Sequence, residues 1–375
     1  MQTRQRDSRA DAILLLGAAT FLFNAPVARA ADVAVAKPAP TVAAPPAAPA
    51  LTPGPLGVFG VDMPAPGKLV VSIVPTIANF SGLRMGQNRV TNEYAVTTAP
   101  YFFNPSTPVR IVPQNIASRT EVLGLSYGVT RDFTVVANVG AAQKSLEAMA
   151  FRGPSGIVQL KRNLPGVEGL TDFALSGIYR VYQDDVNRIQ MSIGFTFPTG
   201  TTKATFNDFV VPNGQTQTIR GFYGMQTGTG TFDFMPGIVY AGQIGAWSWG
   251  ASYRGRFPLA ANQQGYMYGD LHEFSGWGGY SWVPGFTTTV RVAASMQGPI
   301  RGFDPEIRGA AAPANPNFYG GQRVEVFGGG SISGKFIGYD NWTLLGEAGL
   351  PVFQNLNGPQ IEKNWQASIC VRVRI

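Results

Sequence analysis

Charged side chains in this sequence recur at alternating positions within segments that are otherwise uncharged. The acids and bases of interest are Asp233, Arg254, Arg256, Glu273, Arg291, Arg323, Glu325 and Glu347. Basic groups that face acidic groups across a narrow passage form a constriction that favours anions or polar solutes. The same groups could instead pair with one another and fill the interior, because buried charges are paired whether or not anything passes. The sequence leaves both interpretations open.

Residues suited to catalysis or metal binding are scarce. The chain has one histidine, His272, and Ser275 lies three residues further on. On an extended strand these two side chains point to opposite faces, so they do not form a nucleophile and its base. One histidine and one cysteine, Cys370, are too few for a typical zinc site. We therefore expect no enzymatic activity, no metal and no other cofactor.

Two faces can be separated in the stretch GTFDFMPGIVYAGQIGAWSWGASYRGRF, residues 230–257. Every second residue is apolar, as at Phe232, Phe234 and Ile238, and the positions between include Asp233 and Arg254. This alternation predicts a two-stranded hairpin with one apolar and one polar face. A soluble sandwich would bury the apolar face, whereas a membrane barrel would turn it toward lipid and enclose the polar face.

The pattern extends along most of the chain and predicts twelve strands. They span residues 68–80, 116–127, 133–145, 170–182, 188–198, 227–241, 247–258, 269–282, 286–297, 321–334, 341–350 and 364–375. Most exceed the roughly 5 to 6 residues typical of soluble strands and reach the roughly 9 to 11 that a tilted transmembrane strand needs. Short and longer connectors alternate, as in outer-membrane barrels. The sequence therefore predicts an all-β fold, a transmembrane antiparallel β-barrel of about twelve strands over residues 67–375.

Aromatic residues and charges fit the same arrangement. The residues that flank the short connectors include Tyr127, Tyr240, Trp247, Trp282, Phe286 and Trp342, which we expect to form an interfacial girdle. The polar face adds Lys144, Arg180, Arg372, Arg374 and Asp172 to the charges above, and Trp277 and Phe327 also point inward in this register. A twelve-stranded lumen should be narrow. Pro75 and Pro236 should each cause a bulge or a local break, because proline removes a ladder donor.

The first 66 residues lie before the predicted barrel. Residues 1–30 carry a basic start, an apolar core at 13–23 and a small-x-small site that ends at Ala30, which predicts a cleaved signal peptide. Residues 31–66 are rich in alanine and proline, and we expect a disordered periplasmic tether. No other segment is long and apolar enough for a transmembrane helix. The Lys and Arg residues are spread along the chain, which argues against nucleic acid as a partner.

Several segments resemble a known family. They are SYGVTRDFTVVANV (126–139), FPTGTT (197–202), MQTGTGTFDFMPGIVYAGQIGAWSWGASYRG (225–255) and GEAGLPVFQNLNGPQIEKNWQ (346–366). These resemble outer-membrane transporters of the "MetA-pathway of phenol degradation" type, over about residues 116–375. The resemblance implies a β-barrel through which small molecules pass.

The sequence thus favours a porin-like channel in the outer membrane of a Gram-negative bacterium. We expect passive or gated passage of small solutes, including small aromatic or hydrophobic compounds, through a narrow charged lumen. Its partners would be the lipid bilayer, the solute and, during biogenesis, the barrel-assembly machinery. The alternative is a non-conducting barrel whose long extracellular loops bind a partner or surface. A soluble secreted β-protein is a third interpretation.

Overall fold

A closed antiparallel sheet dominates the computed structural model, which describes residues 52–339 and 341–375. Its strands are β1 (Leu69–Gly86), β5 (Ile111–Gly128), β6 (Phe133–Phe151), β9 (Phe173–Gln183), β10 (Asn187–Phe197), β13 (Asp233–Ile244), β14 (Trp247–Pro258), β16 (Leu271–Val283), β17 (Phe286–Gln297), β19 (Gly321–Ser333) and β20 (Trp342–Arg374). Each of these strands pairs with its neighbours, and pairing between β1 and β5 closes the barrel. The predicted all-β barrel is confirmed.

The last strand, β20, contributes two arms to the wall. Thr343 pairs with Ser333 and Leu356 with Gly321, so the first arm runs antiparallel to β19. The second arm pairs with β1, from Leu356 opposite Gly86 to Arg374 opposite Val70. Strand β20 therefore reverses direction near Leu356, and the wall has twelve strands when the two arms are counted separately. We expected a loop at 351–363, which was wrong because the arms remain in extended pairing beyond the predicted strand ends.

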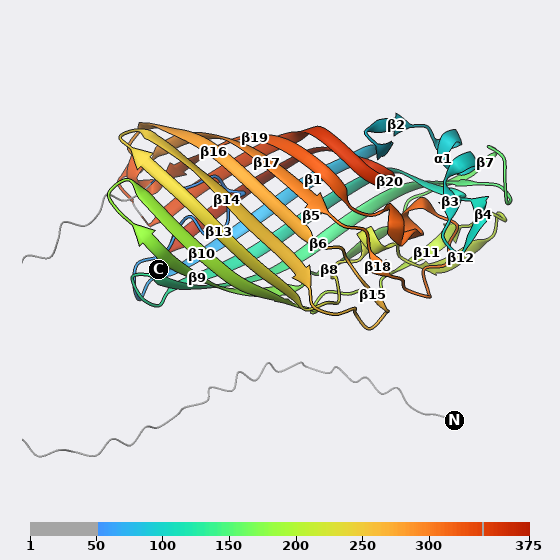
Figure 1. Ribbon diagram of the computed structural model, residues 1–375, viewed down its shortest axis with the longest axis horizontal. Coiled ribbons are helices and arrows are strands. Elements are labelled where there is room, and N and C mark those ends of the chain that lie inside the picture. Colours follow the sequence, from blue (N-terminus) through green and yellow to red (C-terminus); the bar gives the residue numbers. More distant parts are fainter. Residues whose placement is uncertain (1–51, 340) are drawn as a thin grey trace, which may run out of the picture. The chain divides into compact units, whose positions relative to one another are not determined.

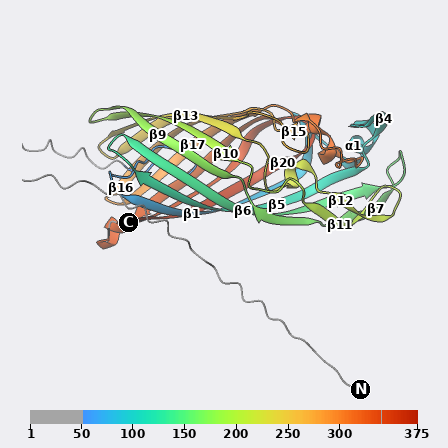
Figure 2. The same cartoon turned by 90° about the horizontal axis from the view of Figure 1, so that it is seen from below.

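Two ends of the barrel differ in the length of their connectors. Short turns join β5 to β6, β9 to β10, β13 to β14 and β16 to β17, and we call this the short-turn end. The small elements α1 (Asn92–Thr98), β3 (Pro100–Tyr101), β4 (Asn104–Pro108), β7 (Gln159–Asn163), β11 (Thr205–Val210) and β12 (Thr216–Arg220) gather at the other, long-loop end (Figures 1 and 2). The last residue, Ile375, lies at the short-turn end, where its backbone exchanges hydrogen bonds with Leu69.

The outer face of the barrel is apolar. Ile73, Ile193, Val290 and Ile369 lie on separate strands, and each exposes more than half of its surface. Water would not tolerate a continuous apolar band of this extent on a monomer, whereas a bilayer requires it. The apolar face of residues 230–257 accordingly points outward: Ile238 is 43% exposed, while Asp233 on the polar face is fully buried.

Both prolines that we expected to disturb the sheet do so on one side only. Pro75 keeps its place opposite Glu121 of β5, and Pro236 opposite Ile193 of β10. On the other side, the ladder between β1 and β20 is interrupted at Pro75, and that between β13 and β14 at Pro236. The result is a local break without a bulge, as expected for a residue that lacks one ladder donor.

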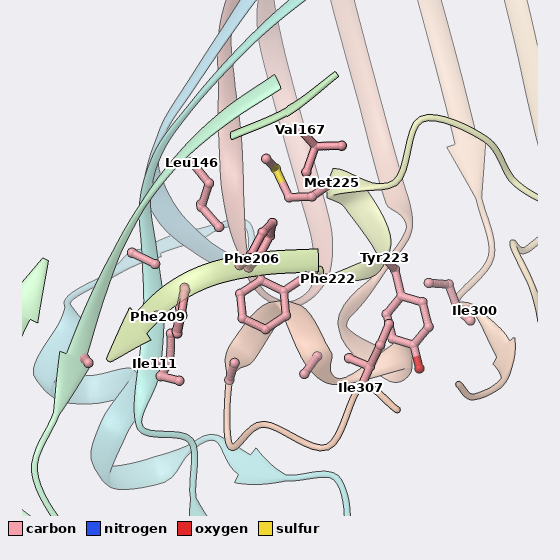
Figure 3. Packing of buried hydrophobic residues seen from close by; sticks show 14 of the residues in the cluster. Ile111, Leu146, Val167, Phe206, Phe209, Phe222, Tyr223, Met225, Ile300 and Ile307 are labelled. Atoms are coloured by element: carbon pink, nitrogen blue, oxygen red, sulfur yellow. The ribbon is translucent and has the colours of Figure 1, made fainter. Parts of the chain in front are cut away.

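Folded loops form a cap at the long-loop end. Its core includes the stacked rings of Phe206 and Phe209, with centroids 5.7 Å apart, and Phe222 against their edges. Figure 3 shows these rings gathered near Ile111 and Leu146, which lie on extended parts of β5 and β6. The long connectors therefore form a packed layer of their own.

One buried arginine forms hydrogen bonds to several segments of the cap. Arg110 is 2% exposed, and its guanidinium donates hydrogen bonds to the carbonyls of Val96 (2.9 Å), Arg152 (2.7 Å) and Gly156 (2.8 Å). It also lies over the ring of Phe151, at 5.9 Å. Burial lowers the pKa of Arg110 from its ordinary value, but a guanidinium stays charged at neutral pH.

No helix within the described residues is long and apolar enough to cross a membrane. The predicted signal peptide, with its cleavage after Ala30, and the first part of the predicted tether lie outside the described residues.

The remainder of the predicted tether does not behave as expected. Residues 52–66, which we call the inserted segment, lie inside the barrel. They contact inward side chains from β9, β10, β14, β17 and β20, which face one another across the lumen. The prediction of a disordered tether over 31–66 is therefore wrong for this part, because the segment finds polar partners on the inner wall.

Candidate functional site

The inner wall of the barrel carries the charged residues that we predicted. Arg254 on β14 lies directly opposite Glu273 on β16, and Arg291 on β17 lies opposite Trp277 on β16. Residues two apart on a strand share a face, so Glu273, Ser275 and Trp277 all point inward. Trp277 packs there against Val61 of the inserted segment.

The inserted segment enters and leaves the lumen at the short-turn end. At its start, the backbone N–H of Thr52 donates a hydrogen bond to Gln243 Oε1 (2.9 Å), and the Thr52 hydroxyl lies 3.2 Å from that of Ser281. At its other end the N–H of Gly67 donates to the carbonyl of Gly128, beside the first turn. The chain between Thr52 and Gly67 therefore forms a loop that enters the lumen and leaves it at the same end.

Polar contacts hold this loop on its returning side. The carbonyl of Val61 accepts a hydrogen bond from Gln190 Nε2 (3.3 Å), and Asp62 accepts one from Arg372 Nη1 (2.6 Å). The loop forms no strand pairing with the wall. It is thus held by side chains rather than by a backbone ladder.

The first half of the loop lies against a buried ion pair at Gly57. Arg291 and Glu347 pair through both guanidinium and carboxylate branches, with Nε to Oε2 at 3.1 Å, and the Arg291 guanidinium lies 4.0 Å above the ring of Phe327. A Cβ at Gly57 would lie 2.3 Å from Arg291 Nη2. Only glycine permits so close an approach of backbone to side chain.

Beside this loop is a cavity of about 210 Å³, which we call the lumen cavity. Gly57, Phe59 and Gly60 of the inserted segment form one wall. The barrel supplies the polar lining: Arg254, Glu273, Ser275, Arg291, Glu325, Lys363, Gln190 and Gln366. A roomy polar cavity of this kind holds water or a small polar solute.

A second cavity, of about 430 Å³, lies nearer the long-loop end. There Arg256 Nε bonds to Asp233 (2.5 Å), and its Nη2 reaches Thr229 (3.3 Å) and Asp172 (3.8 Å). Asp172 also accepts the backbone N–H groups of Gly200 (3.0 Å) and Thr229 (2.7 Å). These charges are satisfied by one another and by the backbone, so they serve to fix the start of β13.

The structure thus divides the predicted lumen residues among several places. Arg254, Glu273, Arg291 and Glu325 line the lumen cavity, and Glu347 lies behind Arg291. Asp233 and Arg256 belong to the second cavity. Arg323 belongs to neither, and its Nε donates to Gln354 (3.3 Å). Some of these charges are therefore paired and others line a cavity, while selection of solutes at a constriction stays a prediction.

The predicted girdle residues lie at the short-turn end. Trp247 at the start of β14 and Trp282 near the end of β16 are more than 60% exposed, and Tyr127 at the end of β5 is 46% exposed. Tyr240 is half-buried and donates from its hydroxyl to Asn187 (2.8 Å). Phe286 and Trp342 begin β17 and β20 and are also half-buried.

The imidazole of His272 lies among aromatic side chains. Its Nδ1 lies 3.0 Å from the hydroxyl of Tyr253, beside the ring of Phe257. Ser275 lies on the lumen side of the sheet instead, where its Oγ accepts a hydrogen bond from Arg291 Nη1 (3.3 Å). Within residues 52–339 and 341–375, no group of three or more His, Cys, Asp or Glu side chains could hold a metal ion.

Comparison with known proteins gives a likeness in fold. No protein-family model matches the chain, and no curated protein matches it in sequence. The crystal structure of an outer membrane channel from Pseudomonas putida F1 is similar with a TM-score of 0.53 and 10% identity, over 87% of this chain and 100% of that one. A Pseudomonas aeruginosa FadL homologue and the P. putida toluene transporter TodX match with TM-scores of 0.41 and 0.40, at 11% and 12% identity, each over 82% of this chain and 90% of the other.

At these identities the likeness establishes the architecture, an outer-membrane type of β-barrel. The resemblance to the "MetA-pathway of phenol degradation" family stays a prediction.

Sequence reasoning missed the inserted segment and Lys363. Lys363 belongs to the predicted loop at 351–363, yet it is buried and pairs with Glu325 (2.7 Å). The inserted segment did carry a signal, because Asp62 and the apolar residues Val58, Phe59 and Val61 distinguish it from the alanine and proline before it.

Proposed function

We propose that this protein is a channel for small solutes in the outer membrane of a Gram-negative bacterium, closed at rest by the inserted segment. The observation that carries the proposal is that one wall of a charged lumen cavity belongs to a loop without strand pairing rather than to the barrel. A wall made only of strands could not open without breaking the ladder. A loop held by side-chain contacts can move while the barrel stays intact.

Orientation follows the usual rule for such barrels. Short turns face the periplasm and longer loops face outward. The inserted segment would then enter from the periplasm, and the cap would face the exterior. The apolar outer face, with Trp247 and Trp282 at its short-turn edge, supports insertion in a bilayer.

The kind of solute is suggested by the lining. Charged and amide groups predominate in the lumen cavity, with the rings of Phe59 and Phe327 as its apolar parts. We infer passage of small solutes that combine polar groups with a small apolar or aromatic part. The similar Pseudomonas putida structure is that of an outer membrane channel, which supports passage in general. The proposal assigns no enzymatic step to the barrel.

A second candidate function concerns the cap. Phe103 is 40% exposed and Phe303 42%, and they form edge-to-face contacts with one another and with Phe102 at the long-loop end. Exposed aromatic groups of this kind occur at protein–protein contacts. This observation favours the alternative of a barrel whose loops bind a partner or surface.

Single-channel recording tests the proposal. Residues 31–375 would be folded into a planar bilayer, and current in symmetric salt would be compared with that of a variant that lacks residues 52–66. We expect rare, discrete openings for the complete protein and sustained openings for the deletion. Arg254→Ala should shift the ion preference toward cations, while Arg119→Ala, on the exposed part of β5, should not.

The outcomes separate the two candidate functions. A deletion variant that conducts no current would refute the proposed channel function, provided that its compact and heat-sensitive migration on a detergent gel shows that it is folded. In that case Phe103→Ala and Phe303→Ala would be tested for loss of surface binding.

A further inference from the structure

Two opposite charges in the lumen cavity are left without a partner. Arg254 and Glu273 lie directly opposite one another on β14 and β16, where neighbouring Cβ atoms are about 4.5 to 5.5 Å apart. Neither forms an ion pair with any residue in the described part of the chain, and both are exposed to the cavity. The other charges of the cavity are paired: Arg291 with Glu347, and Lys363 with Glu325.

The inserted segment explains why these two groups stay apart. The Arg254 guanidinium lies over the ring of Phe59, at 5.4 Å, and its Nη2 lies 3.7 Å from Met235 Sδ. The guanidinium thus lies between Phe59 of the segment and Met235 of β13, and it forms no ion pair with Glu273 among the described residues. The Glu273 carboxylate consequently faces the cavity with no hydrogen-bond donor from the described residues. The cavity thus presents one available cation and one available anion.

We propose that the lumen cavity binds a small zwitterionic solute. Its anionic group would accept hydrogen bonds from the planar fork of Arg254, and its cationic group would donate to Glu273. A solute with a single charge would satisfy only one of the two and leave the other uncompensated in a narrow lumen.

The size of the cavity fits this class. A volume of about 210 Å³ corresponds to roughly seven water molecules at about 30 Å³ each. That is room for a molecule of amino-acid size. The rings of Phe59 and Phe327 offer apolar surface to a side chain of the solute.

The inference rests on the proposed function, because a site inside the lumen can be filled only if small solutes enter it. Binding and conduction are nevertheless measured separately, so each can fail alone.

Three probes of the same shape test the charge requirement. L-phenylalanine carries both charges, 3-phenylpropionate lacks the ammonium, and 2-phenylethylamine lacks the carboxylate. Binding to folded residues 31–375 in detergent would be measured by titration calorimetry. We expect L-phenylalanine to bind at least about tenfold more tightly than either analogue, because each lost charge-assisted hydrogen bond weakens binding by about that factor or more.

Substitutions assign each charge to its residue. Arg254→Gln should reduce the affinity for L-phenylalanine to that for 2-phenylethylamine, and Glu273→Gln should reduce it to that for 3-phenylpropionate. The exchange of both charges, Arg254→Glu with Glu273→Arg, should restore the preference for the zwitterion. Arg119→Gln and Glu121→Gln are matched controls, because this exposed pair lies outside the cavity and should leave all three affinities unchanged.

Equal affinity for the three probes would overturn the inference, as would the absence of binding by protein whose migration shows that it is folded. If the single substitutions fail to fold, the comparison of probes on the unsubstituted protein still decides. Channel recordings on the same preparation identify which idea has failed. Conduction without a preference for the zwitterion overturns this inference alone, whereas a folded and silent deletion of residues 52–66 overturns the proposed function.

Discussion

A single methyl group at residue 57 should open the channel. In Gly57→Ala the new Cβ would lie 2.3 Å from Arg291 Nη2, 2.6 Å from its Cζ and 2.9 Å from Glu347 Oε1. The end of an arginine side chain can usually move aside. Here it is held by two bonds to Glu347 and by the ring of Phe327, and it is buried. The inserted segment, which has no ladder, is the part that must yield.

The size of the effect follows from the cost of overpacking. An extra methylene in a well-packed site costs about 1 to 3 kcal/mol. If the strain is relieved when the segment leaves the lumen, the ratio of open to closed states rises about 5- to 150-fold. Single-channel open probability measures this ratio directly, and conductance per opening should stay unchanged because the wall itself is not altered.

A matched control adds the same methyl where it meets nothing. Gly278 on β16 has no atom within 4 Å of the position of a Cβ, so Gly278→Ala should behave like the unsubstituted protein. The reasoning would be refuted if Gly57→Ala stayed as closed as the unsubstituted protein, or if both substitutions raised the open probability alike.

Further substitutions test the buried pair, the outer face and the cap. Glu347→Gln should lower the free energy of unfolding by about 3 kcal/mol in urea titrations, because it leaves the Arg291 charge buried and unpaired. Val290→Arg places a charge on the lipid face and should cost about 2 to 4 kcal/mol in folding into bilayers. Arg110→Met removes three hydrogen bonds to backbone carbonyls, so proteolysis of the cap should become at least severalfold faster while the barrel stays resistant. Burial raises the pKa of Tyr223 to about 12. The stability that the protonated Tyr223 contributes to the cap should therefore be complete below about pH 10, the ordinary pKa of tyrosine, and should be lost as the pH rises through 12. Tyrosinate absorbance that appears in full near pH 10 would contradict this.

The barrel could be predicted because its strands obey a simple periodicity. The strands expected at 247–258 and 286–297 coincide with β14 and β17. In both, lipid on one side and polar lumen on the other impose strict alternation. Prediction failed where that contrast ends. Strand β6 continues to Phe151, six residues beyond its expected end, because its last part packs in the cap rather than in the membrane.

The charged site could be predicted only as a set of candidates. Alternation identifies which residues point inward, and it did so for Arg254, Glu273 and Arg291. It does not determine which inward charges pair, because pairing depends on distances between strands far apart in sequence. Glu347 lies 56 residues from Arg291, and the sheet brings them together because only β19 lies between β17 and β20.

The inserted segment shows why composition was misleading at the start of the fold. Glycine and proline prevent residues 52–66 from forming a strand or helix, and in solution such a chain would stay extended and mobile. Inside the barrel the same features become useful. Gly57 allows the backbone to approach the Arg291–Glu347 pair, and the absence of a ladder lets the segment leave without disrupting the wall. A segment that cannot fold alone, but carries Phe59 and Asp62 at positions matched by Arg254 and Arg372, is suited to reversible closure of a lumen.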